Sequence, residues 1–310
     1  MLALARDAIP QDPGLAYEPK WDGFRCVISR DGDDIVLGSR GSKTLTRYFP
    51  EVVAALQDWL PDGAIVDGEL VVRSGPVGAE RLQWDALSAR IHPAESRIAM
   101  LSAQTPAEVV CFDVLAIGSH DLTAQPWHRR RTRLEELFES RDSQAGVHLG
   151  QYTQDIDRAR EWFDLFEGAG LDGVVCKPRD GAYQQGKRGW IKVKHQRSAE
   201  AVVTGYRVHK RGRGVGSLLL GMYDQHGTLV PVGGIGSFTD ALRDQLEADL
   251  QPLVRRGTDG LPIALERPRS RFSSSADQSA IALAPELVVE VGFDQLEGRR
   301  FRHAVQLLRF

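Results

Sequence analysis

The pattern of apolar residues changes near residue 198, and this change restricts the possible folds more than any other feature. Before it, helical and strand-like segments are mixed; after it, short strand-like segments dominate. These short segments lie at 199–206, 217–222, 229–235, 287–291 and 304–310, with one helical segment at about 240–254. Five short strands and one helix predict a small β-barrel of the OB type over residues 198–310. Because 310 residues exceed one ordinary core, residues 1–197 are expected to form a separate domain.

The first domain combines predicted strands and helices. Alternating apolar residues predict a hairpin over 17–39, with its turn at residues 30–34. Further strands are predicted at 65–72, 109–117, 174–177 and 190–194, and helices at 49–60, after Pro126 and at about 156–166. The run Asp67-Gly68-Glu69 is expected to interrupt the strand at 65–72. An α+β architecture is therefore predicted.

Composition and cysteine usage indicate the cellular compartment in which the protein is expected. Hydrophobic residues make up 42% and charged residues 26% of the chain, which is typical of a soluble globular protein. The sequence has no apolar run near the ~20 residues that span a bilayer, and its first residues do not resemble a signal peptide. Cys26, Cys111 and Cys176 are far apart in apolar stretches, and no C-x-x-C pair suggests zinc. We therefore expect a cytoplasmic protein with reduced thiols and no membrane attachment.

Basic residues are concentrated in one part of the chain, although its net charge is only −3. Residues 187–213 contain nine lysines and arginines and one acidic residue, Glu200. This asymmetry predicts a local phosphate-binding surface; a solvated charged face is the alternative.

Lys20 lies in the run Glu18-Pro19-Lys20-Trp21-Asp22-Gly23, which contains the pattern K-x-D-G. A lysine becomes a nucleophile when desolvation or nearby cations lower its pKa. The pattern alone also fits a strand end followed by an Asp-Gly turn, so its companions matter. They follow in the order Ser39-Arg40-Gly41, Asp67-Gly68-Glu69, Cys111-Phe112-Asp113, 171–177 and 190–194. Together they supply residue types that hold a base, neutralise a triphosphate and bind a divalent metal.

This order of motifs resembles the covalent nucleotidyltransferase superfamily, and most closely the ATP-dependent DNA ligases of the small bacterial and end-joining types. The resemblance covers nearly the whole chain, including 287–293 and 298–303. It implies a nucleotidyltransferase (adenylation) domain of mixed antiparallel sheets with flanking helices over 1–197, followed by an OB-fold domain over 198–310. It also implies that Lys20 takes AMP from ATP as a lysyl phosphoramidate. The AMP then passes to the 5′-phosphate of a nick, which the 3′-hydroxyl seals.

The resemblance implies roles for individual residues. Glu18 helps to read adenine, Phe112 stacks on it, and Arg25 points toward the sugar or phosphates. Arg40 binds the 5′-phosphate, and Glu69 lies near the ribose and the metal. Further nucleotide contacts are expected from Lys177, Arg188, Lys192 and Lys194, and Mg²⁺ or Mn²⁺ is expected at Glu69 and Asp172.

Three of these positions can also be argued from their own sequence context. Lys192 and Lys194 alternate with apolar residues, so both lie on one face of a predicted strand. Two ammonium groups there would attract a triphosphate and help to keep Lys20 neutral. Asp172 stands where the family more often has glutamate, so this shorter carboxylate must reach a metal at closer range or through water.

The expected partner is nicked double-stranded DNA, held in the cleft between the two domains. Phosphate contacts are expected from Arg40, Arg129, Arg130, Arg131, Arg207, Lys210, Arg211 and Arg213. Such contacts carry little sequence information and weaken with salt. The protein is expected to act as a monomer at the nucleoid in DNA repair, together with other repair or end-joining proteins.

Other functions share parts of the pattern. An RNA ligase or a GTP-dependent capping enzyme uses the same lysine chemistry. NAD⁺-dependent ligases share Lys-x-Asp-Gly, but resemble longer chains with zinc modules. The family's last motif, R-x-D-K or R-x-D-R, is absent before the chain stops at Phe310. Either the sequence is truncated before this motif, or the protein's reaction with ATP is impaired while later steps survive. We expect slow self-adenylation with better sealing of pre-adenylated nicks. The missing motif also slightly favours a DNA-end-binding module, which would bind DNA equally well after Lys20→Ala.

Overall fold

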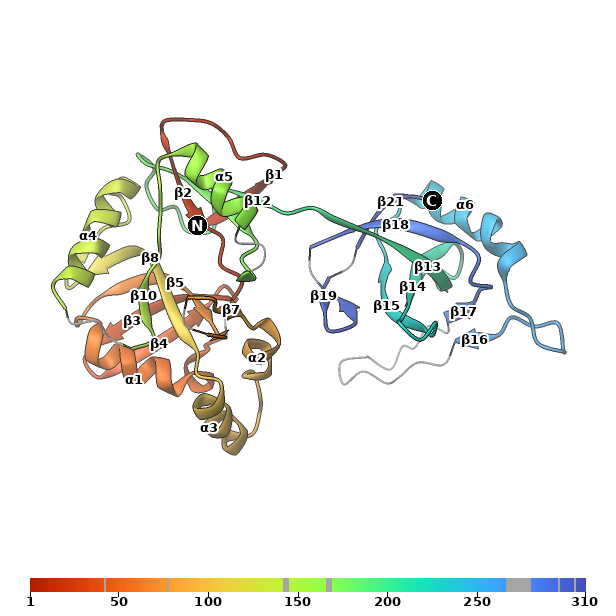
Figure 1. The fold of residues 1–310 in the computed structure, drawn as a ribbon, viewed down its shortest axis with the longest axis horizontal. Coiled ribbons are helices and arrows are strands. Elements are labelled where there is room, and N and C mark those ends of the chain that lie inside the picture. The colour runs from red at the N-terminus through yellow and green to blue at the C-terminus, as the bar shows by residue number, and fades with distance from the viewer. Residues whose placement is uncertain are drawn as a thin grey trace. The chain divides into compact units, whose positions relative to one another are not determined.

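The computed structural model describes residues 1 to 310 apart from 42, 77, 142–144, 166–168, 266–279, 295 and 304. The described residues form two compact units, Met1–His195 and Gln196–Phe310. This division falls close to residue 197, where the sequence predicts a boundary. Each unit has a hydrophobic core of its own, and each is described by itself (Figure 1).

The first unit is built around a six-stranded sheet in the order β10-β8-β5-β3-β4, with β9 also paired to β8. Its strands are β3 (Phe24–Asp31), β4 (Asp34–Ser39), β5 (Ile65–Val71), β8 (Glu108–Ile117), β9 (His120–Asp121) and β10 (Val147–Leu149). All pairs are antiparallel except β8 with β10. This arrangement agrees with the mixed sheet expected for the first domain.

Strands β3 and β4 form the predicted hairpin. Its turn contains Gly32, whose φ of 57° lies in the left-handed region that glycine adopts without steric cost. Residues 17–19, which the sequence assigns to the same hairpin, lie instead in β2 (Leu15–Pro19) of another sheet. That part of the prediction is wrong, because the chain passes from one sheet to the other between β2 and β3.

Strand β5 carries Asp67-Gly68-Glu69 without the expected interruption. The irregularity lies in its pairing, because the register with β8 shifts between Asp67 and Gly68. A Cβ atom at Gly68 would lie 2.8 Å from the carbonyl oxygen of Val110, so only glycine allows the two strands to approach this closely.

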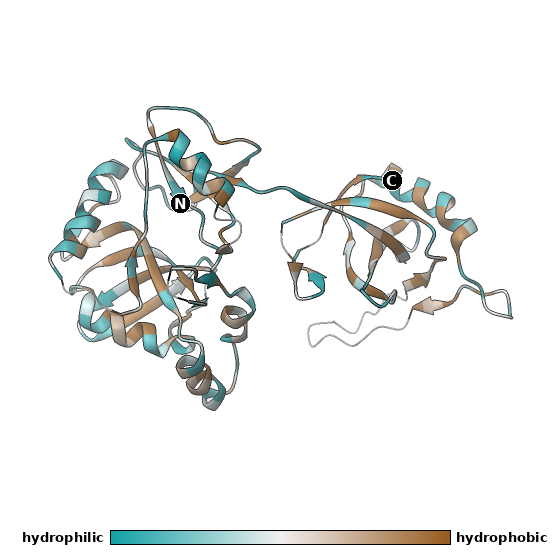
Figure 2. Ribbon diagram, in the orientation of Figure 1, coloured by the Kyte–Doolittle hydropathy of each residue, from teal (hydrophilic) through white to brown (hydrophobic). Residues whose placement is uncertain are grey.

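Two helices, α1 (Pro50–Trp59) and α4 (Trp127–Glu139), pack against this sheet and share its core. On α1, Val52, Leu56 and Trp59 are buried at helical spacing, which confirms the predicted helix. Hydrophobic residues follow the strands that face this core (Figure 2). The 3₁₀ helix η1 (Thr46–Tyr48) precedes α1, and the segment between β5 and β8 adds β6 (Arg73–Ser74), β7 (Arg81–Leu82), α2 (Trp84–Ala89) and α3 (Glu95–Gln104).

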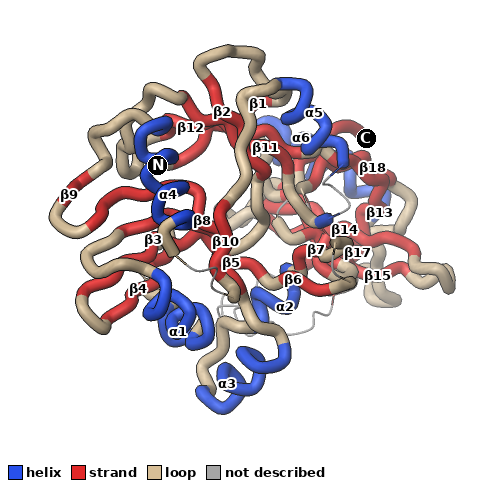
Figure 3. Tube along the Cα trace, turned by 60° about the vertical axis from the view of Figure 1, so that its left-hand side comes forward, coloured by secondary structure: helices blue, strands red, loops and turns tan. Residues whose placement is uncertain are grey.

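A second, four-stranded sheet completes the first unit in the order β1-β12-β11-β2. Strands β1 (Leu2–Arg6) and β12 (Arg188–Lys194) are parallel, and β11 (Gly173–Pro178) is antiparallel to both of its neighbours. Helix α5 (Ile156–Leu165) packs against β2 and β11 (Figure 3). The helix is predicted to continue to Phe166, which lies outside the described residues. This sheet places the strand before Lys20 directly beside the motif at 171–177, and the motif at 190–194 lies on the other side of that motif's strand.

The second unit is a curled sheet in the order β15-β14-β13-β17-β16, with β18 joining β13 to β21. Its elements are β13 (Arg197–Val208), β14 (Val215–Tyr223), β15 (Leu229–Ile235), α6 (Asp240–Leu250), η3 (Gln251–Leu253), β16 (Ala264–Leu265), β17 (Ala280–Ala282), β18 (Val288–Phe293), β19 (Leu296–Glu297), β20 (Arg300–Phe301) and β21 (Gln306–Arg309). Helix α6 covers its core through Leu246 and Leu250. The unit agrees with the predicted OB fold, although the last predicted strand begins at residue 304, outside the described residues.

Helix α6 begins at Thr239, whose Oγ1 accepts a hydrogen bond from the amide of Leu242. It ends before the predicted residue 254, because Pro252 lies in the 3₁₀ turn that follows. In the described part of the chain, no helix has the length and apolarity needed to cross a membrane.

Candidate active site

Lys20 follows β2 and is held from both sides by the backbone of the neighbouring strand. Its amide donates to the carbonyl of Gly173 at 2.8 Å, and the amide of Asp172 donates to the carbonyl of Lys20 at 3.0 Å. The Lys20 side chain is 18% exposed, and its Nζ donates to Asp172 Oδ2 at 2.7 Å. Lys194 Nζ lies 2.7 Å from the same oxygen. The predicted nucleophile therefore shares one carboxylate with a lysine of the last motif.

Cations gather around this carboxylate. Burial, together with Lys194, Lys20 and Arg40, holds the pKa of Lys192 below its ordinary value. Burial opposes ionisation of Asp172, but Lys20 and Lys194 outweigh it and hold the pKa of this carboxyl below its ordinary value. The structure thus brings the two lysines of β12 to Lys20, as their alternation indicates. No sequence pattern indicated the direct hydrogen bond to Asp172, which the Lys20 amine must break before it can attack.

Glu69 completes the site from β5 of the other sheet. Burial raises the pKa of this half-buried carboxyl to about 8, while Lys20 and Arg25 oppose the shift. The charge of Lys20 therefore favours the ionised form of both Glu69 and Asp172. Carboxylate oxygens are the ligands that Mg²⁺ prefers, and it usually takes only one or two from a protein beside substrate phosphates and water. Glu69 and Asp172 supply two such carboxylates within the electrostatic influence of Lys20, so they fit an ion that also binds substrate phosphates.

Glu18 and Lys177 form a buried ion pair between β2 and β11. Lys177 Nζ lies 2.7 Å from Glu18 Oε2, and 4.3 Å from the ring centroids of both Phe112 and Trp190. Burial raises the pKa of Glu18, although Lys177 and Arg131 oppose this. Among the described residues Glu18 Oε1 has no hydrogen-bond partner, an arrangement that is costly unless a ligand supplies a donor. The predicted adenine-reading residue therefore presents a buried acceptor.

Arg25 is anchored by an acidic residue that had no predicted role, and its predicted place beside the sugar or phosphates stays a prediction. Its Nε donates to Asp67 Oδ1 at 3.0 Å and its Nη2 to Asp67 Oδ2 at 2.5 Å. Its guanidinium lies 4.8 Å from the ring centroid of Trp190. Asp67 and Trp190 belong to motifs that the sequence analysis quotes without giving them a role. Tyr183, which also contacts Asp67, lies in no motif, so no sequence signal indicated it.

Arg130 and Arg131 are not on the surface, so their assignment to DNA contacts is wrong. Arg130 is 0% exposed and makes two hydrogen bonds to Asp113, at 2.8 and 2.9 Å. Arg131 is 4% exposed and lies over the ring of Tyr152. Both belong to the buried stripe of α4, as its helical spacing could have indicated. Their neighbour Arg129 is exposed and stays a candidate.

The other predicted phosphate contacts lie at or near the surface. Arg40 follows β4 and is exposed, and Arg188 is exposed at the start of β12. In the second unit, Lys210, Arg211 and Arg213 are exposed in the turn between β13 and β14, and Arg207 is half-buried. Arg211 also pairs with Asp240 at 2.9 Å. These positions are compatible with phosphate binding, which stays a prediction.

Comparison with known proteins places this site in a family. Residues 2–194 match the model of the ATP dependent DNA ligase domain, and residues 211–310 match the ATP dependent DNA ligase C terminal region. The chain is 49% identical to DNA ligase C1 of Mycolicibacterium smegmatis and 46% identical to DNA ligase C of Mycobacterium tuberculosis, each over 100% of this chain and 88% of the relative. A solved structure of a Lig E DNA ligase shares the fold, with a TM-score of 0.62, 17% identity, and coverage of 99% of this chain and 98% of that one. With Lys20 between Asp172, Lys192 and Lys194 and these matches along its length, the chain belongs to the ATP-dependent DNA ligases.

Proposed function

We propose that Lys20 is the residue of this ligase that takes AMP from ATP, and that the enzyme seals nicks during DNA repair. The observation that carries this proposal is the position of Lys20 Nζ. It donates a hydrogen bond to Asp172 at 2.7 Å and interacts electrostatically with Lys192 and Glu69. A nucleophilic amine that is partly buried among cations is suited to a nucleotide phosphate.

Charge attraction orients the substrate in this mechanism. Lys192, Lys194 and Arg40 draw in the triphosphate, and the buried acceptor Glu18 Oε1 receives the amino group of adenine. A bound Mg²⁺ or Mn²⁺, held by Glu69 and Asp172, would neutralise part of the phosphate charge. We expect the phosphates to compete for Lys194 and so to loosen its hold on Asp172.

The chemical step is a substitution at the α-phosphorus. Lys20 Nζ loses a proton, for which Asp172 is placed because it already accepts a hydrogen bond from that nitrogen. The P–N bond forms, the bond from the α-phosphorus to the bridging oxygen breaks, and pyrophosphate leaves. The AMP then passes to the 5′-phosphate at the nick, and attack by the 3′-hydroxyl releases it.

The DNA contacts of this proposal are to phosphates. Exposed Arg40, Arg129, Lys210, Arg211 and Arg213 would bind the backbone of nicked DNA without reading its sequence. We propose that the enzyme acts as a monomer at the nucleoid, beside other repair or end-joining proteins. The names of its relatives, which are DNA ligases, support the DNA substrate.

Mass spectrometry of the purified protein tests the role of Lys20. The protein incubated with ATP and Mg²⁺ should gain the mass of AMP on Lys20, and pyrophosphate should remove it. Lys20→Ala and Lys20→Arg should both abolish the addition, whereas Lys43→Ala, which removes an exposed lysine, should keep it. AMP on any other residue would overturn the proposal.

Substrate competition tests the alternatives. ATP should form the adenylate in preference to GTP and NAD⁺, and nicked DNA should be sealed in preference to nicked RNA. A preference for GTP or for nicked RNA would instead favour a capping enzyme or an RNA ligase.

A further inference from the structure

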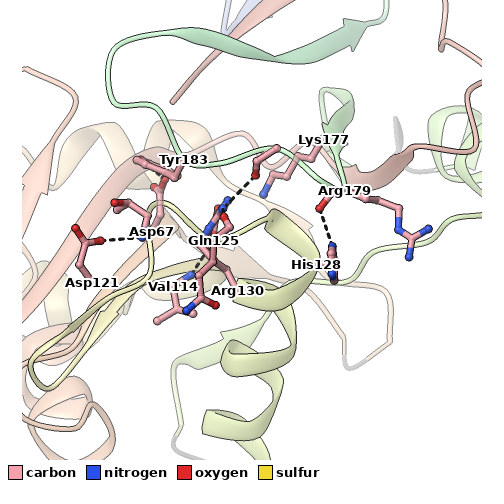
Figure 4. Close-up of polar contacts among 12 residues, drawn as sticks. Asp67, Val114, Asp121, Gln125, His128, Arg130, Lys177, Arg179 and Tyr183 are labelled. Carbon is pink, nitrogen blue, oxygen red and sulfur yellow. Dashed lines mark hydrogen bonds and ion pairs between the residues drawn. The ribbon is translucent and has the colours of Figure 1, made fainter.

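The loop between β11 and β12 is anchored to the beginning of helix α4. The amide of Trp127 donates to the carbonyl of Gly181 at 2.9 Å, and Arg130 Nη1 donates to the same carbonyl at 3.2 Å. The amide of Tyr183 donates to the carbonyl of Thr123 at 2.8 Å. Figure 4 shows Tyr183 projecting from this loop to Asp67. The loop therefore has fixed backbone contacts at Gly181 and at Tyr183.

The hydroxyl group of Tyr183 joins the ion pair of Arg25 and Asp67. It donates to Asp67 Oδ2 at 2.9 Å and accepts a hydrogen bond from Arg25 Nη2 at 3.3 Å. Asp67 is 0% exposed, so it depends on protein donors for its hydrogen bonds. Arg25, Asp67 and Tyr183 thus form a set in which each is bonded to the other two, and Arg25 Nη1 also donates to the carbonyl of Met1.

This set limits how the guanidinium group of Arg25 can turn. Two of its nitrogens bond to Asp67, and its face lies over Trp190, whose ring also contacts Lys177. A long arginine side chain otherwise has several rotamers, and ordering it costs free energy at each binding event. A guanidinium held in advance avoids that cost.

We propose that Tyr183 is a positioning residue of the nucleotide site, which holds Arg25, through Asp67, in the orientation in which it meets ATP. This inference rests on the proposed function and on the predicted place of Arg25 beside the sugar or phosphates of the bound nucleotide. Tyr183 acts through Arg25 and does not itself touch the nucleotide.

The substitution Tyr183→Phe removes only the hydroxyl group. A hydrogen bond to a charged group is stronger than one between neutral groups, and its complete loss would change an equilibrium constant about tenfold or more. Part of this stabilisation is shared with the remaining bonds of Asp67. We therefore expect the KM for ATP in formation of the Lys20 adenylate to rise about tenfold, with kcat nearly unchanged. The Kd of the unreactive analogue α,β-methylene-ATP should rise by a similar factor.

Two controls separate positioning from a loss of folding. Tyr48→Phe, in the short helix before α1, removes a hydroxyl from the core region of the same unit and should leave KM and Kd unchanged. The Tm of Tyr183→Phe is measured, and the kinetics are recorded where the variant is folded, because unfolded protein lowers the apparent kcat and leaves KM unchanged. In an Arg25→Lys background, Tyr183→Phe should add little, since the guanidinium that it positions is gone.

The outcomes distinguish the two proposals. If the wild type forms the Lys20 adenylate and Tyr183→Phe keeps its KM and Kd, the positioning role is wrong and the proposed function stands. The same holds if the loss is confined to kcat, or if the effects of Arg25→Lys and Tyr183→Phe simply add. If the wild type forms no adenylate on Lys20, the proposed function itself fails.

Discussion

At the scale of single residues, the site consists of charged groups, and the ion-pair partners of each group determine which atoms are available to a ligand. Lys20 and Lys194 share one oxygen of Asp172, so a change at one member alters the others. Glu18 differs, because one of its oxygens pairs with Lys177 and the other has no partner in the described part of the chain. This difference makes Glu18 the best position at which to test recognition of the base.

Glu18→Gln should weaken selection of adenine. An amide can offer a donor as well as an acceptor, so it no longer favours the amino group of adenine over the carbonyl of guanine. The KM for ATP should rise about tenfold, and the preference for ATP over GTP should fall. Measurement of adenylate and guanylate formation at a range of nucleotide concentrations checks this, with Glu139→Gln on the exposed side of α4 as the control. Unchanged selectivity would rule out Glu18 as the base reader.

At the scale of elements, helix α4 shows why neighbouring arginines have different roles. Arg130 and Arg131 lie on its buried stripe with Leu134 and Leu137, whereas Arg129 is exposed. Arg130 neutralises the buried carboxylate of Asp113 and supports the loop that carries Tyr183. In this basic run, Arg130 and Arg131 therefore stabilise the fold, whereas Arg129 is available at the surface.

Arg130→Ala should destabilise the first unit by about 3–5 kcal/mol, because it leaves the buried charge of Asp113 uncompensated. Arg129→Ala, on the next residue but on the exposed side, should change stability by less than about 0.5 kcal/mol. Urea unfolding followed by tryptophan fluorescence measures both. Equal effects of the two substitutions would contradict the burial pattern of α4.

A second element-scale prediction concerns pH. Burial opposes ionisation of Glu108, at the start of β8, but hydrogen bonds from His148 and Arg73 outweigh it and hold the pKa of Glu108 below its ordinary 4.5. A lowered carboxyl pKa contributes stability that is complete above the unfolded value and is lost as the pH falls through the folded value. Glu108→Gln should therefore destabilise the protein at pH 7, and its difference from the wild type should shrink as the pH falls below 4.5 and through the folded pKa. Unfolding free energies at pH 7, 5.5 and 3 test this, and a difference that does not change with pH would refute it.

At the scale of the whole molecule, the two units carry different parts of the chemistry. The residues proposed for nucleotide binding all lie in Met1–His195, and the second unit adds the exposed cations Lys210, Arg211 and Arg213. Binding of DNA phosphates releases counterions, so affinity depends on the number of such contacts and on salt.

Affinity for nicked DNA should fall steeply with salt. Combined replacement of Lys210, Arg211 and Arg213 by alanine should reduce the slope of log K against log salt by about three. Replacement of Arg158 and Arg160 on α5, which are not among the predicted phosphate contacts, should leave the slope unchanged. Fluorescence anisotropy at several salt concentrations measures the slopes, and an unaltered slope in the triple variant would remove these residues from the interface.

The sequence by itself determined the family, the nucleophile candidate and most of the regular elements. Covalent nucleotidyl transfer requires particular residue types at short spacings, so its motifs can be recognised in the sequence. Helices and strands can be recognised as well, because they follow local periodicity. Only the tertiary structure decided which side chains of the site are hydrogen-bonded to one another. Lys20 meets Asp172 across 152 positions, Arg25 meets Asp67 across 42, and Tyr183 reaches Asp67 across 116. These contacts depend on which strands pair and which face a side chain occupies, and for that reason Arg130 proved to be buried and Tyr183 was not predicted.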